Sequence, residues 1–221
     1  MTFEEKISLI SIGLKNPLPG EKQQLLMSPE FRGLPDLPPP LKKAAVMICI
    51  IPGEKDLQTI FIKRNEYDGP HSGQISFPGG IYEEKDIELS ETALRETKEE
   101  IGIDCSRTAL LGALTPLLIP VSNVLVYPFV GYYGNSPMFT LDKREVDYLI
   151  IPQIADLLNP GCIKKEKWNL RGMDIEVPFY LINENIIWGA TAMILSEFLE
   201  IISRSGLYKP YPYSGNDRSE T

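Results

Sequence analysis

The sequence lacks a long apolar run. None of its hydrophobic stretches approaches the roughly 20 residues that a helix needs to cross a bilayer. Near the start, Glu4 and Glu5 stand where a secretory signal would carry basic residues ahead of an apolar segment. We therefore expect no membrane association and a cytoplasmic location.

Cysteine and histidine are scarce. The three cysteines, Cys49, Cys105 and Cys162, are widely spaced and form no C-x-x-C pair, so we expect neither a disulfide framework nor a zinc site. A lone histidine such as His71 is more often structural or exposed than catalytic. Its loop precedes a glycine pair, so contact with a substrate is the alternative for this residue.

An excess of positive charge is also absent. Lysine and arginine number 22 against 30 aspartates and glutamates, which gives a net charge of −8. Nucleic-acid backbones are bound by basic faces, so we expect no nucleic-acid partner. A small anionic substrate stays compatible with this charge if a cation bridges it to carboxylates.

The composition suits one globular domain. Of its 221 residues, 43% are apolar and 24% are charged, which is enough for a sizeable core. Apolar spacing predicts helices over residues 2–14, 21–27, 89–101 and 188–203, and a short one from Ile154. Apolar and β-branched runs predict strands over residues 44–51, 58–63, 75–77, 110–118, 123–133, 169–170 and 175–182. Strands before and after one helix, with another helix near the end, predict an α/β sandwich with a mixed sheet between helices.

Composition divides the chain into three parts. Residues 1–40 form a helical arm and a proline-rich connector, 41–205 form the domain, and 206–221 form a flexible tail. The arm can pack on its own domain or on a second copy of the chain. A homodimer is therefore one of the two assemblies that the sequence allows.

Three glutamates gather on one side of the predicted 89–101 helix. Glu96 and Glu100 lie four residues apart and Glu99 lies beside them. Like charges at this spacing destabilise a helix by about 0.2 to 0.5 kcal/mol per pair, and acids near a helix C-terminus oppose its dipole. A solvated acidic face is one explanation. A divalent cation is the other, because carboxylate oxygens suit Mg²⁺ or Mn²⁺, and the preceding glycine pair and Arg95 favour it.

The glycine pair, the acidic helix and their spacing resemble a known signature. Gly80 is followed after five residues by Asp86 and, after eight more, by the run Arg95-Glu96-Thr97-Lys98-Glu99-Glu100-Ile101-Gly102-Ile103. This pattern resembles the Nudix hydrolase signature G-x5-E-x7-R-E-U-x-E-E-x-G-U, in which U is aliphatic. It departs by having Asp86 instead of glutamate, one extra residue before Arg95, and Thr97 at an aliphatic position. The resemblance implies a Nudix-type α/β/α sandwich that hydrolyses a nucleoside diphosphate linked to another group.

A second stretch resembles one branch of that family. Residues 61–65 and 73–80 are similar to the motif L-L-T-x-[ST]-x3-R-x3-G-x3-F-P-G-G of coenzyme A pyrophosphatases, and the lengthened box is also similar to that branch. The implied reaction is hydrolysis of coenzyme A or acyl-coenzyme A to 3′,5′-ADP and 4′-phosphopantetheine or its acyl form. Gly69 stands where the motif has an arginine, and Lys63 or Arg64 could supply the missing base.

The resemblance implies roles for the residues of the signature. Glu96 and Glu100 are expected to bind Mg²⁺ or Mn²⁺, and Glu99 to be a further ligand or the base that activates water. Gly80 is expected to offer its backbone carbonyl to the cation, and Arg95 to orient Glu99 through an ion pair.

An additional ligand and the substrate stay open. Glu145 lies in the kind of late loop from which some Nudix enzymes recruit a further carboxylate, and an ordinary surface position is its alternative. Besides coenzyme A, the substrate could be ADP-ribose, a dinucleotide or a nucleotide sugar. A Nudix-fold binding module without turnover is the third hypothesis, and the intact set of carboxylates argues against it.

Overall fold

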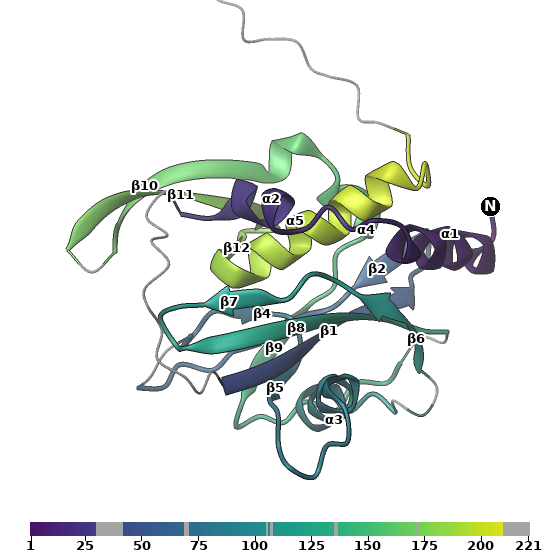
Figure 1. Cartoon of the computed structure of the whole chain (residues 1–221), viewed down its shortest axis with the longest axis horizontal. Coiled ribbons are helices and arrows are strands. Elements are labelled where there is room, and N and C mark those ends of the chain that lie inside the picture. The colour runs from purple at the N-terminus through teal and green to yellow at the C-terminus, as the bar shows by residue number, and fades with distance from the viewer. Residues whose placement is uncertain are drawn as a thin grey trace, which may run out of the picture.

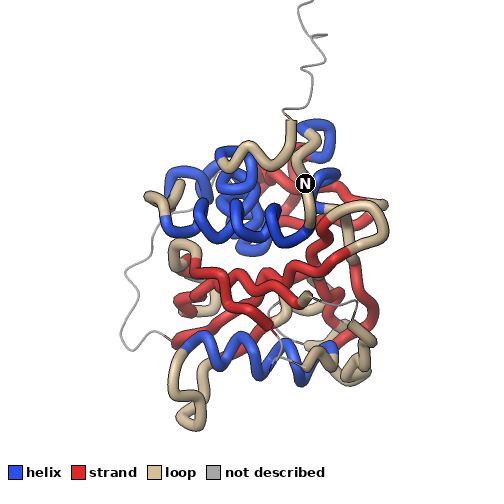
Figure 2. The backbone as a smooth tube through the Cα atoms, turned by 90° about the vertical axis from the view of Figure 1, so that its right-hand side faces the viewer, coloured by secondary structure: helices blue, strands red, loops and turns tan. Residues whose placement is uncertain are grey.

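A mixed β-sheet lies between two layers of helices. The computed structural model describes residues 1–29, 42–68, 71–104, 106, 108–134, 137–170 and 172–209. Helix α3 (Leu89–Ile101) covers one face of the central sheet, and α1 (Phe3–Lys15) and α5 (Gly189–Arg204) cover the other (Figure 1 and Figure 2). The predicted α/β/α sandwich is confirmed.

The central sheet contains both strand directions. Its main path follows the order β2 (Leu57–Thr59), β1 (Lys42–Pro52), β8 (Val124–Tyr133) and β6 (Thr108–Ala113). Two further strands extend it, β5 (Gly79–Ile81) beside β1 and β7 (Leu117–Ile119) beside β8. Strands β1 and β8 run parallel and the other pairs run antiparallel, so the sheet is mixed as predicted.

Two three-stranded sheets flank this centre. One has the order β4 (Ile75–Ser76), β3 (Phe61–Arg64) and β9 (Val146–Ile150). The other consists of β10 (Ile163–Leu170), β11 (Met173–Ile182) and β12 (Asn185–Trp188), and its first two strands form a hairpin that projects from the body (Figure 1). Short helical turns lie between the strands and helices: α2 (Glu21–Gln24), η1 (Leu25–Met27), α4 (Ile154–Leu157) and η3 (Pro160–Cys162).

Strand β1 places alternate side chains in two cores. Ile48 and Ile50 pack with residues of α1 and α5, and Met47 and Cys49 pack with residues of α3. All four side chains are fully buried. A strand buried on both faces appears in the sequence as a continuous apolar run, which explains why this strand was predictable.

Helix α3 forms where apolar spacing and a glycine stop coincide. Ala93, Thr97 and Ile101 are buried at four-residue spacing. Gly102 then ends the helix in the left-handed conformation, with a φ of 76°. This packing fixes which side of α3 carries its glutamates.

The N-terminal segment packs on its own domain. Ile7 and Ile10 of α1 belong to the same core as α5. The buried carboxylate of Glu197 in α5 accepts hydrogen bonds from the Gly20 amide at 3.1 Å and the Gln24 side chain at 2.8 Å. Of the two positions that the sequence allowed for this arm, the structure shows the one on the domain.

The predicted strand over residues 58–63 is wrong as a single element. The chain leaves the central sheet after Thr59 and enters the small sheet at Phe61. The Thr59 amide donates to the carbonyl of Pro152 at 3.2 Å, outside either named strand pair. Residues Thr59, Ile60, Phe61 and Ile62 are all fully buried, so no exposed side chain marks the crossover.

Other strand bounds also differ from the prediction. The segment 110–118 is divided between β6 and β7, because Pro116 has no amide hydrogen to donate. Before this break, the Leu114 amide still donates to the Pro128 carbonyl of β8 at 2.9 Å. Strand β10 begins at Ile163 and not at residue 169, since three exposed lysines and an exposed glutamate hide its alternation. Strands β5, β9 and β12 were not predicted.

The helices are confirmed to within one or two residues. Thr2 caps α1 in a capping box, in which the Glu5 amide donates to the Thr2 hydroxyl at 3.2 Å. The predicted connector at 35–40 and residues 210–221 of the predicted tail lie outside the described residues. Within the part of the chain that the structure describes, no helix has both the length and the apolar character to cross a membrane.

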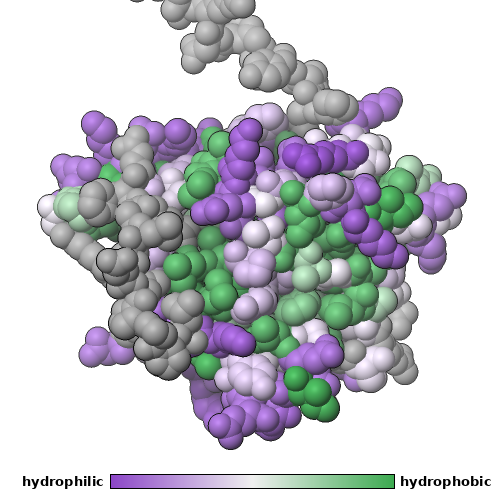
Figure 3. Space-filling model, viewed as in Figure 1, coloured by the Kyte–Doolittle hydropathy of each residue, from purple (hydrophilic) through white to green (hydrophobic). Residues whose placement is uncertain are grey.

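The layering is also visible on the surface. In Figure 3, polar side chains lie along the upper and lower margins, and apolar side chains gather between them over the strands. Among the apolar side chains that stay accessible are Leu110 of β6, which is 46% exposed, and Val121 before β8, which is 59% exposed.

Candidate active site

A glycine turn approaches the acidic side of α3. Gly79 and Gly80 of β5 pair with Val46 and Ala45 of β1. A Cβ on Gly80 would lie 2.5 Å from Oε1 of Glu96, and a Cβ on Gly79 would lie 2.3 Å from the carbonyl oxygen of Ala45. Glycine permits both approaches, and it brings the Gly80 backbone next to the Glu96 carboxylate.

The three glutamates of α3 differ in exposure. The side chain of Glu100 is 2% exposed, that of Glu96 is 14% exposed and that of Glu99 is 53% exposed. Burial raises the pKa of Glu100 to about 7 and also raises the pKa of Glu96. A positive charge placed among these carboxylates would therefore stabilise their ionised forms.

Glu100 is held by the glycine turn and by Arg64. Its Oε2 accepts a hydrogen bond from the Gly79 amide at 2.9 Å, and its Oε1 lies 3.2 Å from Nη2 of Arg64. Oε1 is buried and forms an ion pair but no well-aligned hydrogen bond within the described residues. It is therefore an acceptor with capacity for a further partner.

Arg95 links the helix to the loop before it. Its Nη1 donates to Glu96 at 2.7 Å and to Glu99 at 3.1 Å. Its Nε and Nη2 form a bidentate pair with Asp86, each at 2.9 Å, and Nη2 also donates to the carbonyl of Ile81 at 3.2 Å. The structure thus places Arg95 beside Glu99, where the ion pair was expected. It also shows contacts of Arg95 with Glu96, Asp86 and Ile81.

Asp86 has a position that no sequence expectation covered. Its side chain is 4% exposed and accepts hydrogen bonds from the Thr92 hydroxyl at 2.9 Å and the Glu83 amide at 3.1 Å. The hydrogen bonds from Arg95 hold the pKa of Asp86 well below its usual range. Asp86 connects the loop to α3 and orients Arg95. In the sequence, the acidic residue at this position of the signature was the one indication of such a role.

Glu145 reaches the cluster from the segment before β9. Its negative charge contributes to the raised pKa of both Glu96 and Glu100. Its carbonyl accepts from the Asn65 amide at 3.0 Å, and the Asp142 amide donates to the Glu100 carbonyl at 3.0 Å. The structure therefore places this late-loop segment beside the C-terminal end of α3, where the charge of Glu145 acts on both glutamates.

His71 lies in the β3–β4 loop, and Lys63 contacts this loop from β3. Nδ1 of His71 lies 3.0 Å from Oε1 of Gln74, and His71 has a φ of 65°, both typical of a turn. The Lys63 ammonium donates to the carbonyl of Gly73 and not to the carboxylate cluster. Gly69, where the motif arginine is missing, lies outside the described residues.

The donor set at this place suits a divalent cation. It offers the carboxylates of Glu96, Glu99 and Glu100 and the backbone of Gly80. The close approach of Glu96 to Gly80 and the spare acceptor of Glu100 favour a ligand there. Among the described residues, no three acidic, histidine or cysteine side chains are already spaced as a metal shell. Since Arg95 holds Glu96 and Glu99, these two side chains would turn away from its Nη1 to bind a cation.

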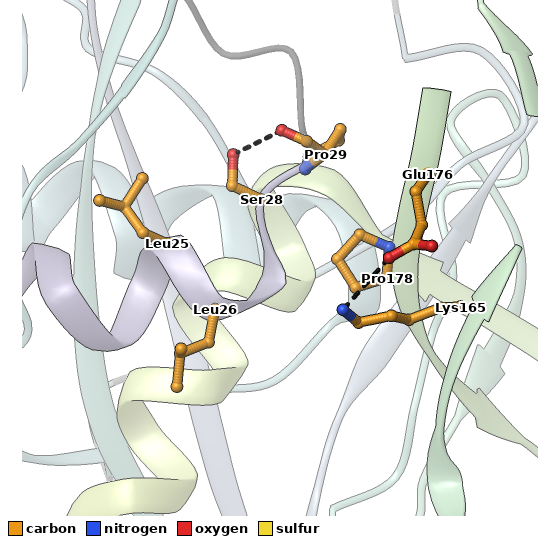
Figure 4. Close-up of a pocket in the computed structure, with 7 residues that line it drawn as sticks. All are labelled: Leu25, Leu26, Ser28, Pro29, Lys165, Glu176 and Pro178. Atoms are coloured by element: carbon orange, nitrogen blue, oxygen red, sulfur yellow. Dashed lines mark hydrogen bonds and ion pairs between the residues drawn. The ribbon is translucent and has the colours of Figure 1, made fainter. Parts of the chain in front are cut away.

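Two surface hollows lie away from the carboxylates. One, of about 370 Å³, is bounded by η1 and by Lys165 and Glu176, which pair at 3.3 Å (Figure 4). The other, of about 330 Å³, is lined by Lys63 and Trp168 among others. Arg64, next to Lys63 on β3, reaches the carboxylates instead, and neither hollow is lined by a residue of the cluster.

A family model identifies the domain that carries this cluster. The model described as the NUDIX domain matches residues 41–161, a span that contains the glycine turn, α3 and Glu145. The chain belongs to the Nudix family.

Curated relatives bear the same family name. "Nudix hydrolase 15, mitochondrial" of Arabidopsis thaliana is 42% identical over 161 residues, which cover 70% of this chain and 56% of that protein. "Nudix hydrolase 22, chloroplastic" of the same plant is 35% identical over 161 residues, which cover 70% of this chain and 53% of that protein. "Uncharacterized Nudix hydrolase NudL" of Photorhabdus laumondii is 31% identical over 171 residues, which cover 74% and 90%. The chain thus spans about half the length of the two plant relatives.

Solved structures give a consistent but distant match. The MutT protein from Methanosarcina mazei Go1 is similar with a TM-score of 0.49 and 18% identity, over 76% of this chain and 96% of that chain. The names of the curated relatives identify the family and state no substrate.

Proposed function

We propose that this chain hydrolyses the pyrophosphate linkage of coenzyme A or acyl-coenzyme A in a reaction that requires Mg²⁺ or Mn²⁺. The products would be 3′,5′-ADP and 4′-phosphopantetheine or its acyl form. One observation carries the proposal: α3 places the carboxylates of Glu96 and Glu100 at the glycine turn, and Arg95 joins Glu96 to Glu99.

The residues of the cluster divide the work. Glu96 and Glu100, at i and i+4 of α3, and the carbonyl of Gly80 would hold the cation. When bound, a divalent cation neutralises phosphate oxygens and lowers the pKa of a bound water. Glu99, the most exposed of the three, would accept the proton of the attacking water or complete the ligand set. Arg95 would keep Glu99 in place through their 3.1 Å contact.

Coenzyme A as the substrate is supported by the sequence. Residues 73–80 are similar to the motif of the coenzyme A pyrophosphatase branch, and the box is longer by one residue as in that branch. The longer box still brings Asp86 into a bidentate pair with Arg95. ADP-ribose, a dinucleotide or a nucleotide sugar is the alternative substrate, because Gly69 replaces the motif arginine.

Partners and location belong to the same proposal. The net charge of −8 supports a small nucleoside diphosphate substrate, held through a cation, and not a nucleic acid. A homodimer and a cytoplasmic location stay predictions, to be checked by light scattering and by cell fractionation. Two relatives are named mitochondrial and chloroplastic, so fractionation would include organelles.

A panel of diphosphate compounds tests the function. Purified protein would be incubated with Mg²⁺ or Mn²⁺ and coenzyme A, acetyl-coenzyme A, ADP-ribose, a diadenosine polyphosphate or a nucleotide sugar, and the products identified by mass. The proposal expects 3′,5′-ADP from the coenzyme A compounds at the highest kcat/KM. Faster turnover of another compound would favour the alternative substrate class, and no turnover of any would favour a binding module.

A further inference from the structure

Arg64 is a charged residue beside the cluster to which the proposed reaction assigns no step. It ends β3, and its side chain is 21% exposed. Its Nε donates to the Ser76 hydroxyl at 3.2 Å, and its Nη2 donates to the Gly79 carbonyl at 3.0 Å. The same Nη2 lies 3.2 Å from Oε1 of Glu100. Two of the three guanidinium nitrogens, Nε and Nη2, are thus engaged with groups of the protein.

Arg64 and Glu100 together hold both polar backbone groups of Gly79. The Gly79 amide donates to Glu100 at 2.9 Å, while the Gly79 carbonyl accepts from Arg64. These bonds limit rotation of the turn that carries the carbonyl of Gly80, the proposed backbone ligand. A displacement of this turn by even 1 Å would matter for a site that depends on fixed geometry.

Arg64 also compensates the charge of Glu100. A carboxylate that is 2% exposed is strongly disfavoured as an ion unless a positive charge lies close to it. Among the described residues, Arg64 is the one side chain that forms an ion pair with Glu100. It therefore balances this carboxylate while no divalent cation is bound.

We propose that Arg64 is a positioning residue, which holds Glu100 and the glycine turn in their cation-binding arrangement before the cation arrives. The inference rests on the cation site of the proposed function. Its Nε and Nη2 are directed at Ser76, Gly79 and Glu100, and through these three groups Arg64 would act on the site. A lysine could supply the charge but not the planar fork that reaches all three groups.

Melting temperatures with and without Mn²⁺ test the charge compensation. Arg64→Gln is expected to lower the melting temperature of the metal-free protein by about 6 °C or more, because it leaves Glu100 buried without a counter-charge. The rise on addition of saturating Mn²⁺ is expected to be larger than in the wild type, since the cation then supplies that charge. Arg204→Gln, which breaks an exposed pair with Glu200, is the matched control and should change neither value by more than about 2 °C.

Steady-state kinetics test the positioning. Arg64→Lys keeps the charge, so its metal-free melting temperature should stay close to that of the wild type. At saturating Mn²⁺ its kcat should fall about tenfold, with a KM within about threefold, because the Gly79 carbonyl loses its partner. The substrate is whichever diphosphate the wild type turns over. Ser76→Ala is the substitute if Arg64→Gln does not fold. It removes the hydroxyl that accepts from Nε of Arg64 and keeps the charge of Arg64, so it should also lower kcat.

Three results would overturn the inference. Equal losses of melting temperature with and without Mn²⁺ would show that Arg64 only supports the fold. A raised KM with unchanged kcat in Arg64→Lys would make it a substrate-binding residue. If Mn²⁺ does not raise the melting temperature of the wild type, the cation site is refuted, and both proposals fail with it. If Mn²⁺ does stabilise the wild type, a failed result for the variants refutes only the role of Arg64.

Discussion

At the scale of single residues, the site depends on a glycine, which has no side chain, as well as on its charged side chains. Gly80 lies where a Cβ would come within 2.5 Å of the Glu96 carboxylate, a distance that no real packing tolerates. Among the three glutamates of α3, only Glu99 has a largely exposed side chain. Each of these facts leads to a prediction about one residue.

Replacing Gly80 by alanine is expected to abolish stabilisation by Mn²⁺. The new methyl group would displace the Glu96 carboxylate from the backbone beside it. Titration of the melting temperature with Mn²⁺ measures the effect independently of turnover. Gly134→Ala is the matched control, because its Cβ would meet only the Tyr132 ring at an ordinary 3.6 Å. A normal Mn²⁺ response in Gly80→Ala would contradict the assignment of this carbonyl.

Glu99→Gln is expected to reduce kcat by at least about 100-fold while the fold stays intact. Losses of this size follow the removal of single catalytic groups, and the exposed position of Glu99 makes a folding defect small. Circular dichroism would verify the fold before the kinetic measurement. Glu200→Gln removes a comparable i,i+4 partner of arginine on α5 and should leave kcat unchanged. Near-normal turnover in Glu99→Gln would refute the role of this carboxylate.

At the scale of elements, the site is a junction between α3 and the loop that precedes it. Asp86 forms this junction by accepting two hydrogen bonds from Arg95 and one from Thr92. Arg95 in turn holds Glu96 and Glu99. The loop is therefore coupled to the helix through one buried carboxylate.

Asp86→Asn is expected to lower the free energy of unfolding by about 1 to 3 kcal/mol, because it removes charge-assisted hydrogen bonds in a buried place. It should also lower kcat about tenfold, since Arg95 loses the partner that orients it. Urea unfolding and steady-state rates give the two values. Glu176→Gln, at an exposed pair with Lys165, is the comparison and should change both little. A stable but slow variant would show that the two effects separate; a fully active one would exclude the coupling.

The sequence was sufficient for α3 and insufficient for the small sheets. In α3, the spacing of Ala93, Thr97 and Ile101 and the stop at Gly102 agree with the packed structure. The chain between Thr59 and Phe61 is buried throughout, so no periodicity marks its passage from one sheet to another. A continuous apolar run is enough to predict a buried strand such as β1, but it does not show where the chain passes from one buried strand to the next.

The same reasoning separates the predicted from the unpredicted parts of the site. The glutamates of α3 and Gly80 belong to one signature of fixed spacing, so the sequence alone could name them. Arg64, on β3, was named only as a possible replacement for the motif arginine, and nothing in the sequence indicates its contact with Glu100. Glu145 was named as a possible further ligand only because of the family resemblance. Contacts of this kind follow from sheet topology, which the strand pattern did not specify.

At the scale of the whole molecule, the two helical layers have different tasks. Helix α3 carries the candidate site on one face of the sheet, and α1 and α5 form the larger core on the other (Figure 2). Because the N-terminal segment shares that core and is hydrogen-bonded to Glu197, residues 1–29 act as part of the domain. Removing apolar contacts of α1 should therefore affect stability and leave the chemistry unchanged.

Ile10 and Ile12 of α1 allow a paired test of this arrangement. Ile10 is fully buried and Ile12 is 54% exposed, so the two alanine variants differ in burial and little else. Ile10→Ala is expected to lower the free energy of unfolding by about 2 to 5 kcal/mol through lost burial and the cavity left behind. Ile12→Ala should change it by no more than about 0.5 kcal/mol. Urea unfolding measures both, and kcat/KM of the folded protein should stay at the wild-type value in each, because α1 lies across the sheet from α3. Equal, small effects on stability would mean that α1 is dispensable to the core, and the N-terminal arm would then be free to pack on another chain.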